Sequence, residues 1–253
     1  MSEWILLRGL TREARHWGAF PERFRTDLND ASGVTLIDLP GIGAERALPD
    51  VASMATFVRG RANAMGLAKP YRLLAMSLGA MAATEWATRH PEEIDRLVLI
   101  NTSMRPFARS VERLRPAALP AFARIAAAWN RPQQCEAIIH RLTCNRRDTA
   151  AADIAEWTAI RASSPVSAAS ALRQLWAAAR FRAPNTPSRC PTLLLSSAAD
   201  GLVDPVCSAR IATRWGTAHA EHPWAGHDLP HDDPAWTCRQ IGEWLRSVDM
   251  SNT

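Results

Sequence analysis

The chain has 253 residues, 47% of them hydrophobic, which is enough to bury the core of one α/β domain. Its formal charge of +5 comes almost wholly from arginine, but no basic block with aromatic residues indicates a nucleic-acid partner. No apolar run approaches the ~20 residues of a membrane helix and the N-terminus does not resemble a signal peptide, so we expect a cytoplasmic protein with no membrane partner.

Strands and helices are predicted to alternate along both flanks of the chain. Short, mostly apolar runs predict strands at residues 4–8, 34–38, 73–76, 97–101 and 190–195, and a sixth short strand is expected at 218–222. Helical spacing and capping residues predict helices at 12–28, 50–66, 78–89, 205–215 and 234–248. This alternation is typical of a parallel sheet with helices on both faces. Because the chain begins directly on its first strand, we expect six parallel strands and no antiparallel neighbour of residues 4–8.

The alternation stops between residues 104 and 189. Prolines near helix starts and possible N-caps predict four helices here, and the residues concerned are Pro116, Pro132, Pro165, Asp148 and Ser164. We expect an all-helical lid at 104–189, inserted after the fourth strand of a core domain made of 1–103 and 190–253. The lid segment contains 14 arginines and five acids, an excess of nine positive charges, so the remainder of the chain is net acidic.

A serine stands at the change from the third strand to the following helix. Ser77 has Ala75 two residues before it and Gly79 two residues after it, as a sharp turn between closely packed strand and helix requires. The pattern is a variant of the G-x-S-x-G nucleophile elbow, with Ala75 in the first glycine position. It makes Ser77 a candidate nucleophile.

A base and an acid follow in the order that an elbow serine requires. Asp200 comes just after the strand at 190–195, and His227 lies between the strand at 218–222 and the last helix. Strand ends of a parallel sheet meet at one edge, where ligands bind in open α/β sheets. We therefore expect both side chains near Ser77.

Neighbouring polar residues compete for these roles. Asp204 begins a helix and is a better N-cap than triad acid. Asp228 adjoins His227 but should point away from it in an extended segment. Asn101 stands where some hydrolases place their acid, and a neutral amide cannot serve as one. His222 and His231 lack the Gly-His pattern.

Taken together, the chain resembles the α/β-hydrolase superfamily, with most similarity to small bacterial carboxylesterases, including those that cleave pimeloyl-acyl-carrier-protein methyl ester. The matching segments extend over nearly the whole chain in family order, with the helical segment at the position of the family's lid. They are Arg8-Gly9-Leu10, Asp-Leu-Pro-Gly-Ile-Gly at 38–43, Met76-Ser77-Leu78-Gly79, Asp-Gly-Leu-Val at 200–203 and Gly226-His227.

The resemblance implies a role for each matching residue. Ser77 would be the nucleophile, His227 the general base and then acid, and Asp200 the carboxylate that orients His227. The backbone N–H groups of Leu10 and Leu78 would form the oxyanion hole.

Arg8 replaces the histidine that often precedes the oxyanion glycine, here Gly9. It is either a strand-end arginine paired with a carboxylate or, with Gly9, a contact to an anionic group of the substrate. Both interpretations remain open at this stage.

The sequence thus predicts a serine hydrolase that cleaves a carboxylic ester through an acyl-enzyme. Thioesterase, lactonase, amidase and acyltransferase activities use the same residues, and a non-catalytic binding protein is a further alternative. No phosphate loop or dinucleotide fingerprint indicates a cofactor, and no pair of His, Cys or carboxylate residues was found to have metal-ligand spacing, so we expect no metal. The arginine-rich lid is either a solvated surface or a docking site for an acidic acyl carrier protein bearing the ester.

Overall fold

Six segments form one parallel sheet in the computed structural model, which describes residues 3–28, 32–43 and 45–251. Every pair of neighbouring strands is parallel, which confirms the predicted sheet. The strands, from one edge to the other, are β2 (Val34–Leu36), β1 (Trp4–Leu7), β3 (Tyr71–Met76), β4 (Ile94–Ile100), β5 (Thr192–Ser197) and β6 (Ala218–His222).

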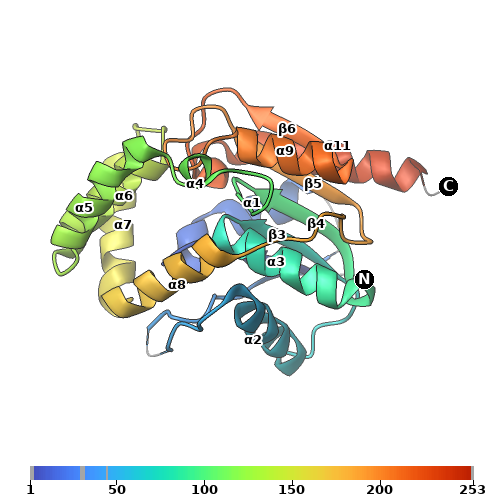
Figure 1. Ribbon diagram of the computed structural model, residues 1–253, viewed down its shortest axis with the longest axis horizontal. Coiled ribbons are helices and arrows are strands. Elements are labelled where there is room, and N and C mark those ends of the chain that lie inside the picture. Colours follow the sequence, from blue (N-terminus) through green and yellow to red (C-terminus); the bar gives the residue numbers. More distant parts are fainter. Residues whose placement is uncertain (1–2, 29–31, 44, 252–253) are drawn as a thin grey trace.

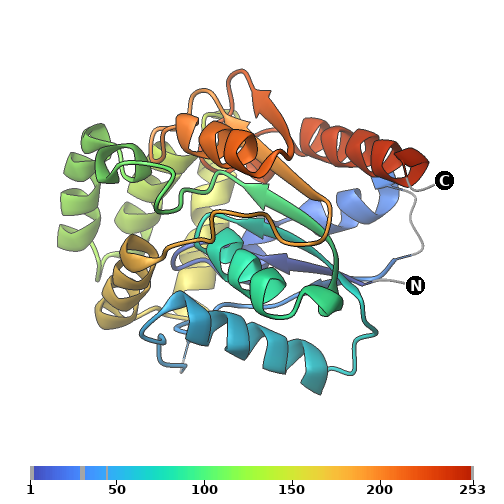
Figure 2. The ribbon, with the colours of Figure 1, turned by 45° about the vertical axis from the view of Figure 1, so that its right-hand side comes forward.

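Helices cover both faces of the sheet because alternate residues of each strand point to opposite sides. In β1, Ile5 and Leu7 pack in one core cluster, whereas Trp4 and Leu6 pack in another. The first cluster lies under α2 (Val51–Ala64), α3 (Leu78–Arg89) and α9 (Val206–Trp215). The second lies under α1 (Phe20–Leu28) and α11 (Pro234–Ser251), as Figures 1 and 2 show. Burial on both faces explains why the central strands are continuously apolar.

The helix expected at residues 12–28 is interrupted. A short 3-10 helix, Ala14–Trp17, comes first, and Gly18 with φ of +52° separates it from α1. A positive φ is accessible to glycine at little strain, so this residue lets the chain change direction. The expectation of one continuous helix was therefore wrong. The helix expected after Asp50 forms, and the Asp50 carboxylate accepts the N–H of Ser53 at 2.7 Å.

The segment between β4 and β5 is entirely helical apart from its connections. A single turn, α4 (Ser110–Arg113), and a short 3-10 helix, Pro116–Ala118, precede the four longer helices that the sequence predicts. These are α5 (Leu119–Ala127), α6 (Pro132–Thr143), α7 (Ala150–Ser163) and α8 (Ala168–Arg180). Two of the expected caps were wrong: Thr149 precedes α7, and Ser167 caps α8 by accepting the N–H of Ser170 at 3.0 Å.

The four helices lie together beyond the end of the sheet at which the strands terminate (Figures 1 and 2). Helix α8 contacts the core through Gln174, whose carbonyl oxygen accepts the Thr11 N–H at 2.8 Å and whose amide donates to the Pro40 carbonyl at 2.9 Å. Glu136 of α6 accepts a hydrogen bond from Arg161 of α7. It also accepts one from Arg12 of the core at 2.6 Å. The lid is therefore attached by buried polar contacts. Within the described ranges, no helix has both the length and the apolar character needed to span a bilayer.

At the opposite end of β4, the buried carboxylate of Glu93 joins three elements. It accepts two hydrogen bonds from Arg59 of α2 at 2.8 Å, one from Lys69 at 2.5 Å and one from the indole of Trp86 in α3 at 2.9 Å. The Arg59 hydrogen bond outweighs the effect of burial and, with Lys69 and Trp86, lowers the pKa of Glu93 to about 2. This carboxylate is thus a stabilising group whose contribution depends on pH.

We predict that Glu93→Gln lowers the free energy of unfolding at pH 7 by on the order of 3 kcal/mol. Because the folded pKa lies below the unfolded value of 4.5, the contribution of Glu93 is complete above pH 4.5 and is lost as pH falls toward 2. Urea unfolding of both proteins should show a difference that narrows below that pH. Glu22→Gln, in an exposed pair with Arg25, is the control and should change little. A difference independent of pH would contradict the prediction.

Candidate active site

The turn between β3 and α3 holds Ser77 in a strained backbone conformation. Its φ of +53° and ψ of −116° are rare for a residue with a side chain and cost about 1–3 kcal/mol. The Ser77 N–H donates to the Ile100 carbonyl at 2.9 Å, and the Thr102 hydroxyl donates to the Ser77 carbonyl at 3.1 Å. The end of the neighbouring strand therefore holds the turn in place.

Small residues around Ser77 allow three backbone segments to meet. A Cβ at Gly79 would lie within 2.8 Å of the Leu7 carbonyl oxygen and nearer still to that of Arg8, so a larger residue would displace the end of β1. A Cβ at Gly9 would lie 3.1 Å from the Ser77 Cβ. Ala75 is accommodated because its methyl group points into the core. The loop at 8–10 consequently lies directly against the serine.

His227 and Asp200 form a buried hydrogen-bonded pair. The Nδ1 atom of His227 is 2.7 Å from Oδ2 of Asp200. The other carboxylate oxygen accepts the N–H groups of Leu202 at 2.7 Å and Val203 at 3.0 Å, so the carboxylate is held on both sides. A carboxylate partner at Nδ1 favours the tautomer whose proton is on that nitrogen, which leaves Nε2 free to accept one. Ser77 and His227 line the same cavity.

Asn101 has a role that the sequence did not reveal. It lies just past the end of β4 with a φ of +45°, and its amide donates to the carbonyl of His227 at 2.8 Å and to the hydroxyl of Ser197 at 3.0 Å. It therefore positions the backbone of His227 and does not replace the acid. Its place at a strand end was visible in the sequence, but its partner was not.

The other polar residues considered for the triad form different contacts. The Asp204 carboxylate accepts the Val206 N–H at 3.0 Å at the start of α9, but Pro205 is the N-cap, so the expected cap was one residue off. His222 lies 3.2 Å from Asp233, and His231 lies 3.0 Å from Asp153. Of the acids considered, Asp200 is the one that contacts His227.

Arg8 forms a buried ion pair with Asp228. Its two terminal nitrogens lie 3.0 and 2.5 Å from the two carboxylate oxygens, and its guanidinium stacks on the Trp17 ring at 4.8 Å. Burial alone would raise the pKa of Asp228, but the charge and hydrogen bonds of Arg8 reverse the effect and hold that pKa well below its usual range. Arg8 and Gly9 do line the cavity beside Ser77. The charge of Arg8 is nevertheless already neutralised, which favours the paired strand-end arginine over a substrate contact.

Two adjoining cavities meet at Ser77. One, of about 250 Å³, contains Ser77 and His227 and is walled mainly by apolar lid residues such as Phe122, Ile125 and Leu142. The other, of about 450 Å³, is lined by Ser77, Leu10, Leu78 and part of α8. Both are suited to an apolar ligand whose polar group lies at the serine.

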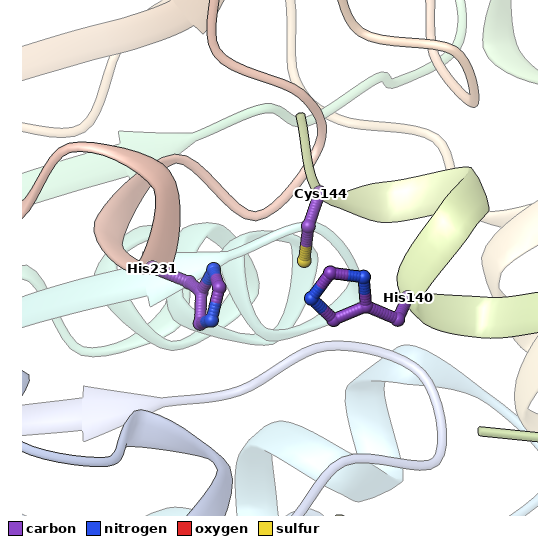
Figure 3. Close-up of side chains that lie close together, drawn as sticks. All are labelled: His140, Cys144 and His231. Carbon is purple, nitrogen blue, oxygen red and sulfur yellow. The ribbon is translucent and has the colours of Figure 1, made fainter. Parts of the chain in front are cut away.

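The structure also brings together His140, Cys144 and His231 outside these cavities (Figure 3). One nitrogen from each histidine and the cysteine sulfur lie within 4.8 Å of one another. His140 and Cys144 are four residues apart, a spacing that places two side chains on one helix face. The sequence interpretation that no such pair has metal-ligand spacing was therefore wrong, and this i, i+4 spacing was the overlooked signal.

Comparisons with known proteins identify the family of the chain. Residues 15–232 match the model of the family described as serine aminopeptidase, S33. Pimeloyl-[acyl-carrier protein] methyl ester esterase of Chromobacterium violaceum is 37% identical over 92 residues, which are 36% of this chain and 34% of that one. The biotin biosynthesis bifunctional protein BioHC of Teredinibacter turnerae is 33% identical over 105 residues, 39% of this chain and 17% of that one. The chain thus spans about a third or less of the curated relatives it matches.

Solved structures share the fold over nearly the entire chain. A thermophilic esterase from Thermogutta terrifontis, solved with malate bound, superimposes with a TM-score of 0.72 at 21% identity. The superposition covers 98% of this chain and 90% of the esterase. Similarity at this level of identity shows a common fold.

We predict that Asp228→Asn lowers the free energy of unfolding by about 3–5 kcal/mol, because it leaves the Arg8 guanidinium buried without a counter-charge. Urea unfolding at pH 7 measures the change. The double variant Arg8→Met, Asp228→Leu should recover most of the loss, since it removes both charges. The control Asp27→Asn breaks the more exposed pair with Arg23 and should cost less than about 1 kcal/mol. Equal losses of unfolding free energy in Asp228→Asn and Asp27→Asn would contradict the prediction.

Proposed function

The chain belongs to the serine aminopeptidase, S33, family of α/β hydrolases, and from this premise we propose that it is an esterase with Ser77 as nucleophile. The observation that carries the proposal is the buried His227–Asp200 pair, 2.7 Å apart, whose histidine lines the same cavity as Ser77. A base oriented by a carboxylate beside a serine is the arrangement that activates a hydroxyl for attack.

In the proposed reaction, the Ser77 oxygen attacks the ester carbonyl while Nε2 of His227 takes the serine proton. The tetrahedral intermediate collapses, His227 gives that proton to the departing alcohol, and an acyl-serine remains. Water then attacks the acyl-serine, His227 takes one of its protons and returns it to Ser77, and the acid leaves. Asp200 keeps the imidazole oriented and stabilises its charged form.

Backbone N–H groups at two positions are suited to the developing oxyanion. Leu78 is the first residue of α3, where N–H groups have no partner within the helix. Leu10 follows Gly9, whose close approach to the Ser77 Cβ brings the loop beside the nucleophile. We propose that these two N–H groups form the oxyanion hole, which in hydrolases of this type is worth about 3–4 kcal/mol per donor.

The two cavities suggest how an ester is accommodated. The narrower cavity has an apolar wall contributed by α5 and α6, which suits a small acyl or alkyl group. The wider one is lined by Leu172 and Trp176, both more than 60% exposed, so it reaches the surface. We propose that a long arm of the substrate leaves through this opening, as an ester attached to a carrier protein requires.

An acidic acyl carrier protein is the partner that we propose. The relative from Chromobacterium violaceum is named for a carrier-bound methyl ester, and the lid has the positive charge that an acidic protein needs. Such charge raises association rates, and salt screens it beyond ~8 Å. The exposed arginines of the lid segment are Arg105, Arg109, Arg124, Arg131, Arg141, Arg147, Arg180, Arg182 and Arg189.

We predict that Ser77→Ala or His227→Ala lowers kcat by at least ~10³, and that Asp200→Asn lowers it somewhat less. Initial rates on esters from acetyl to palmitoyl, with thioesters and lactones of matched acyl groups, test the triad and the bond type together. Labelling by a fluorophosphonate probe should disappear in Ser77→Ala. Asp204→Asn is the control, and a loss there larger than that of Asp200→Asn would show that the wrong acid is assigned. Unchanged labelling in Ser77→Ala would exclude Ser77 as the nucleophile.

We predict that kcat/KM for a carrier-bound methyl ester exceeds that for the free methyl ester at low salt, and that the advantage falls as salt rises. The double variant Arg124→Gln, Arg131→Gln should lose part of this kcat/KM advantage. These side chains are exposed, and each donates to a backbone carbonyl of α5. Arg61→Gln, an exposed arginine of α2, is the control and should leave the ratio unchanged. Equal salt dependence for both substrates would mean that the enzyme acts on small esters and that the lid charge is a solvated surface.

A further inference from the structure

The group formed by His140, Cys144 and His231 joins the lid to the segment that carries His227. His140 lies in α6, Cys144 follows directly after it, and His231 lies in α10 (Leu229–Asp232). Figure 3 shows the two imidazole rings on either side of the thiol. The side chain of His140 is 1% exposed, that of His231 is 18% exposed, and Cys144 is fully buried. The group is therefore shielded from solvent yet near the surface at one ring.

The spacing of the three atoms is close to that of a metal site. Because they lie within 4.8 Å of one another, some point is no farther than about 2.8 Å from each of them. Zinc binds imidazole nitrogen at about 2.0–2.1 Å and thiolate sulfur at about 2.3 Å. An inward shift of less than about 1 Å per ligand would complete the coordination, which is within the reach of side-chain rotation.

The surroundings have features that a packing role does not require. One oxygen of Asp153 in α7 lies 3.1 Å from Nε2 of His140 and 3.0 Å from Nε2 of His231. Asp153 thus places a negative charge beside both imidazole rings, which favours a cation there, and carboxylate oxygen is itself a zinc ligand. Nδ1 of His231 is buried and makes no hydrogen bond among the residues that the structure describes, although the Asp232 carboxylate lies 3.5 Å from it. A metal ion would give this nitrogen the bond that Asp232 does not make.

The second group of potential ligands in the described ranges is less suitable. It consists of His90, Glu92 and Glu93. Glu93 already accepts hydrogen bonds from Arg59, Lys69 and Trp86, so a cation there would have to displace two existing positive charges. Imidazole with thiolate, in contrast, is the ligand combination that zinc prefers.

We propose that His140, Cys144 and His231 bind a zinc ion, with a water or the Asp153 carboxylate as fourth ligand. The ion joins α6 of the lid to α10, four residues from His227. The adjacent backbone already makes this connection, since the Thr143 carbonyl accepts the Asp228 N–H at 2.8 Å. Zinc stabilises the packing of α6 against α10, because the ion binds the folded state alone. The proposal is independent of the esterase proposal, because no step of ester hydrolysis uses this ion.

The test uses full-length protein without a histidine tag, stripped with a chelator and reloaded with zinc or cobalt(II). We expect about one zinc per chain after gel filtration, by plasma mass spectrometry, and a higher Tm for the zinc form. We expect the cobalt form to show a thiolate-to-metal charge-transfer band and intense visible bands of a tetrahedral site. Cys144→Ser should abolish the charge-transfer band and weaken zinc binding by more than about 100-fold, and Asp153→Asn should weaken it by about 10–100-fold.

Cys135→Ser is the matched control. Cys135 lies in α6 and, like Cys144, is a buried free thiol, but it is not part of the group. It should keep zinc and the cobalt spectrum of the unaltered chain. The spectrum of the unaltered protein needs no variant, so it decides the question even if a substituted chain fails to fold. A cobalt form without a thiolate band, or zinc retained equally by Cys144→Ser, would overturn the proposal.

Discussion

The buried ion pair between Arg8 and Asp228 is the interaction on which the candidate site depends. It joins the end of β1, the second strand from one edge of the sheet, to the residue after His227, beyond the last strand. Arg8 therefore belongs to the loop beside Ser77, and Asp228 directly follows the proposed base, His227. Removing two charges from water is unfavourable unless the geometry is close, so the pair holds both loops in one relative position. The strained backbone conformation of Ser77 persists because the packed segments around it fix the path of the turn.

The lid depends on similar buried polar contacts, and these define the walls of the site. Gln174 holds the Thr11 N–H next to the loop at 8–10, and Glu136 holds Arg12 and Arg161 between core and lid. Apolar side chains of α5 and α6 can then wall a cavity without the helices closing on Ser77. The inner surface of the lid is thus apolar while its arginines are mostly exposed. An apolar ester and a charged carrier would contact different faces of the same helices.

The two proposals use separate parts of the molecule. Ester hydrolysis requires Ser77, His227 and Asp200 at the edge where the strands end, whereas the proposed zinc ligands lie where α6 meets α10. They are linked by the short connection from His227 to His231 and by the hydrogen bond from the Asp228 N–H to the Thr143 carbonyl. Zinc would therefore affect the position of the lid and of the His227 segment, and it would take no part in bond cleavage.

Local physics along the chain determined much of this protein. Apolar runs predicted five of the six strands, and the small residues around Ser77 predicted the turn, because strand periodicity and steric limits act over a few residues. Helix ends were less predictable, as Gly18 and the caps at Thr149 and Ser167 show, since several residues compete for each end. Only the tertiary structure could decide that Arg8 pairs with Asp228, 220 residues away, that Asn101 holds His227, and that His231 meets His140 and Cys144. These pairings depend on how loops from distant strands converge at one edge of the sheet, and no local pattern encodes that convergence.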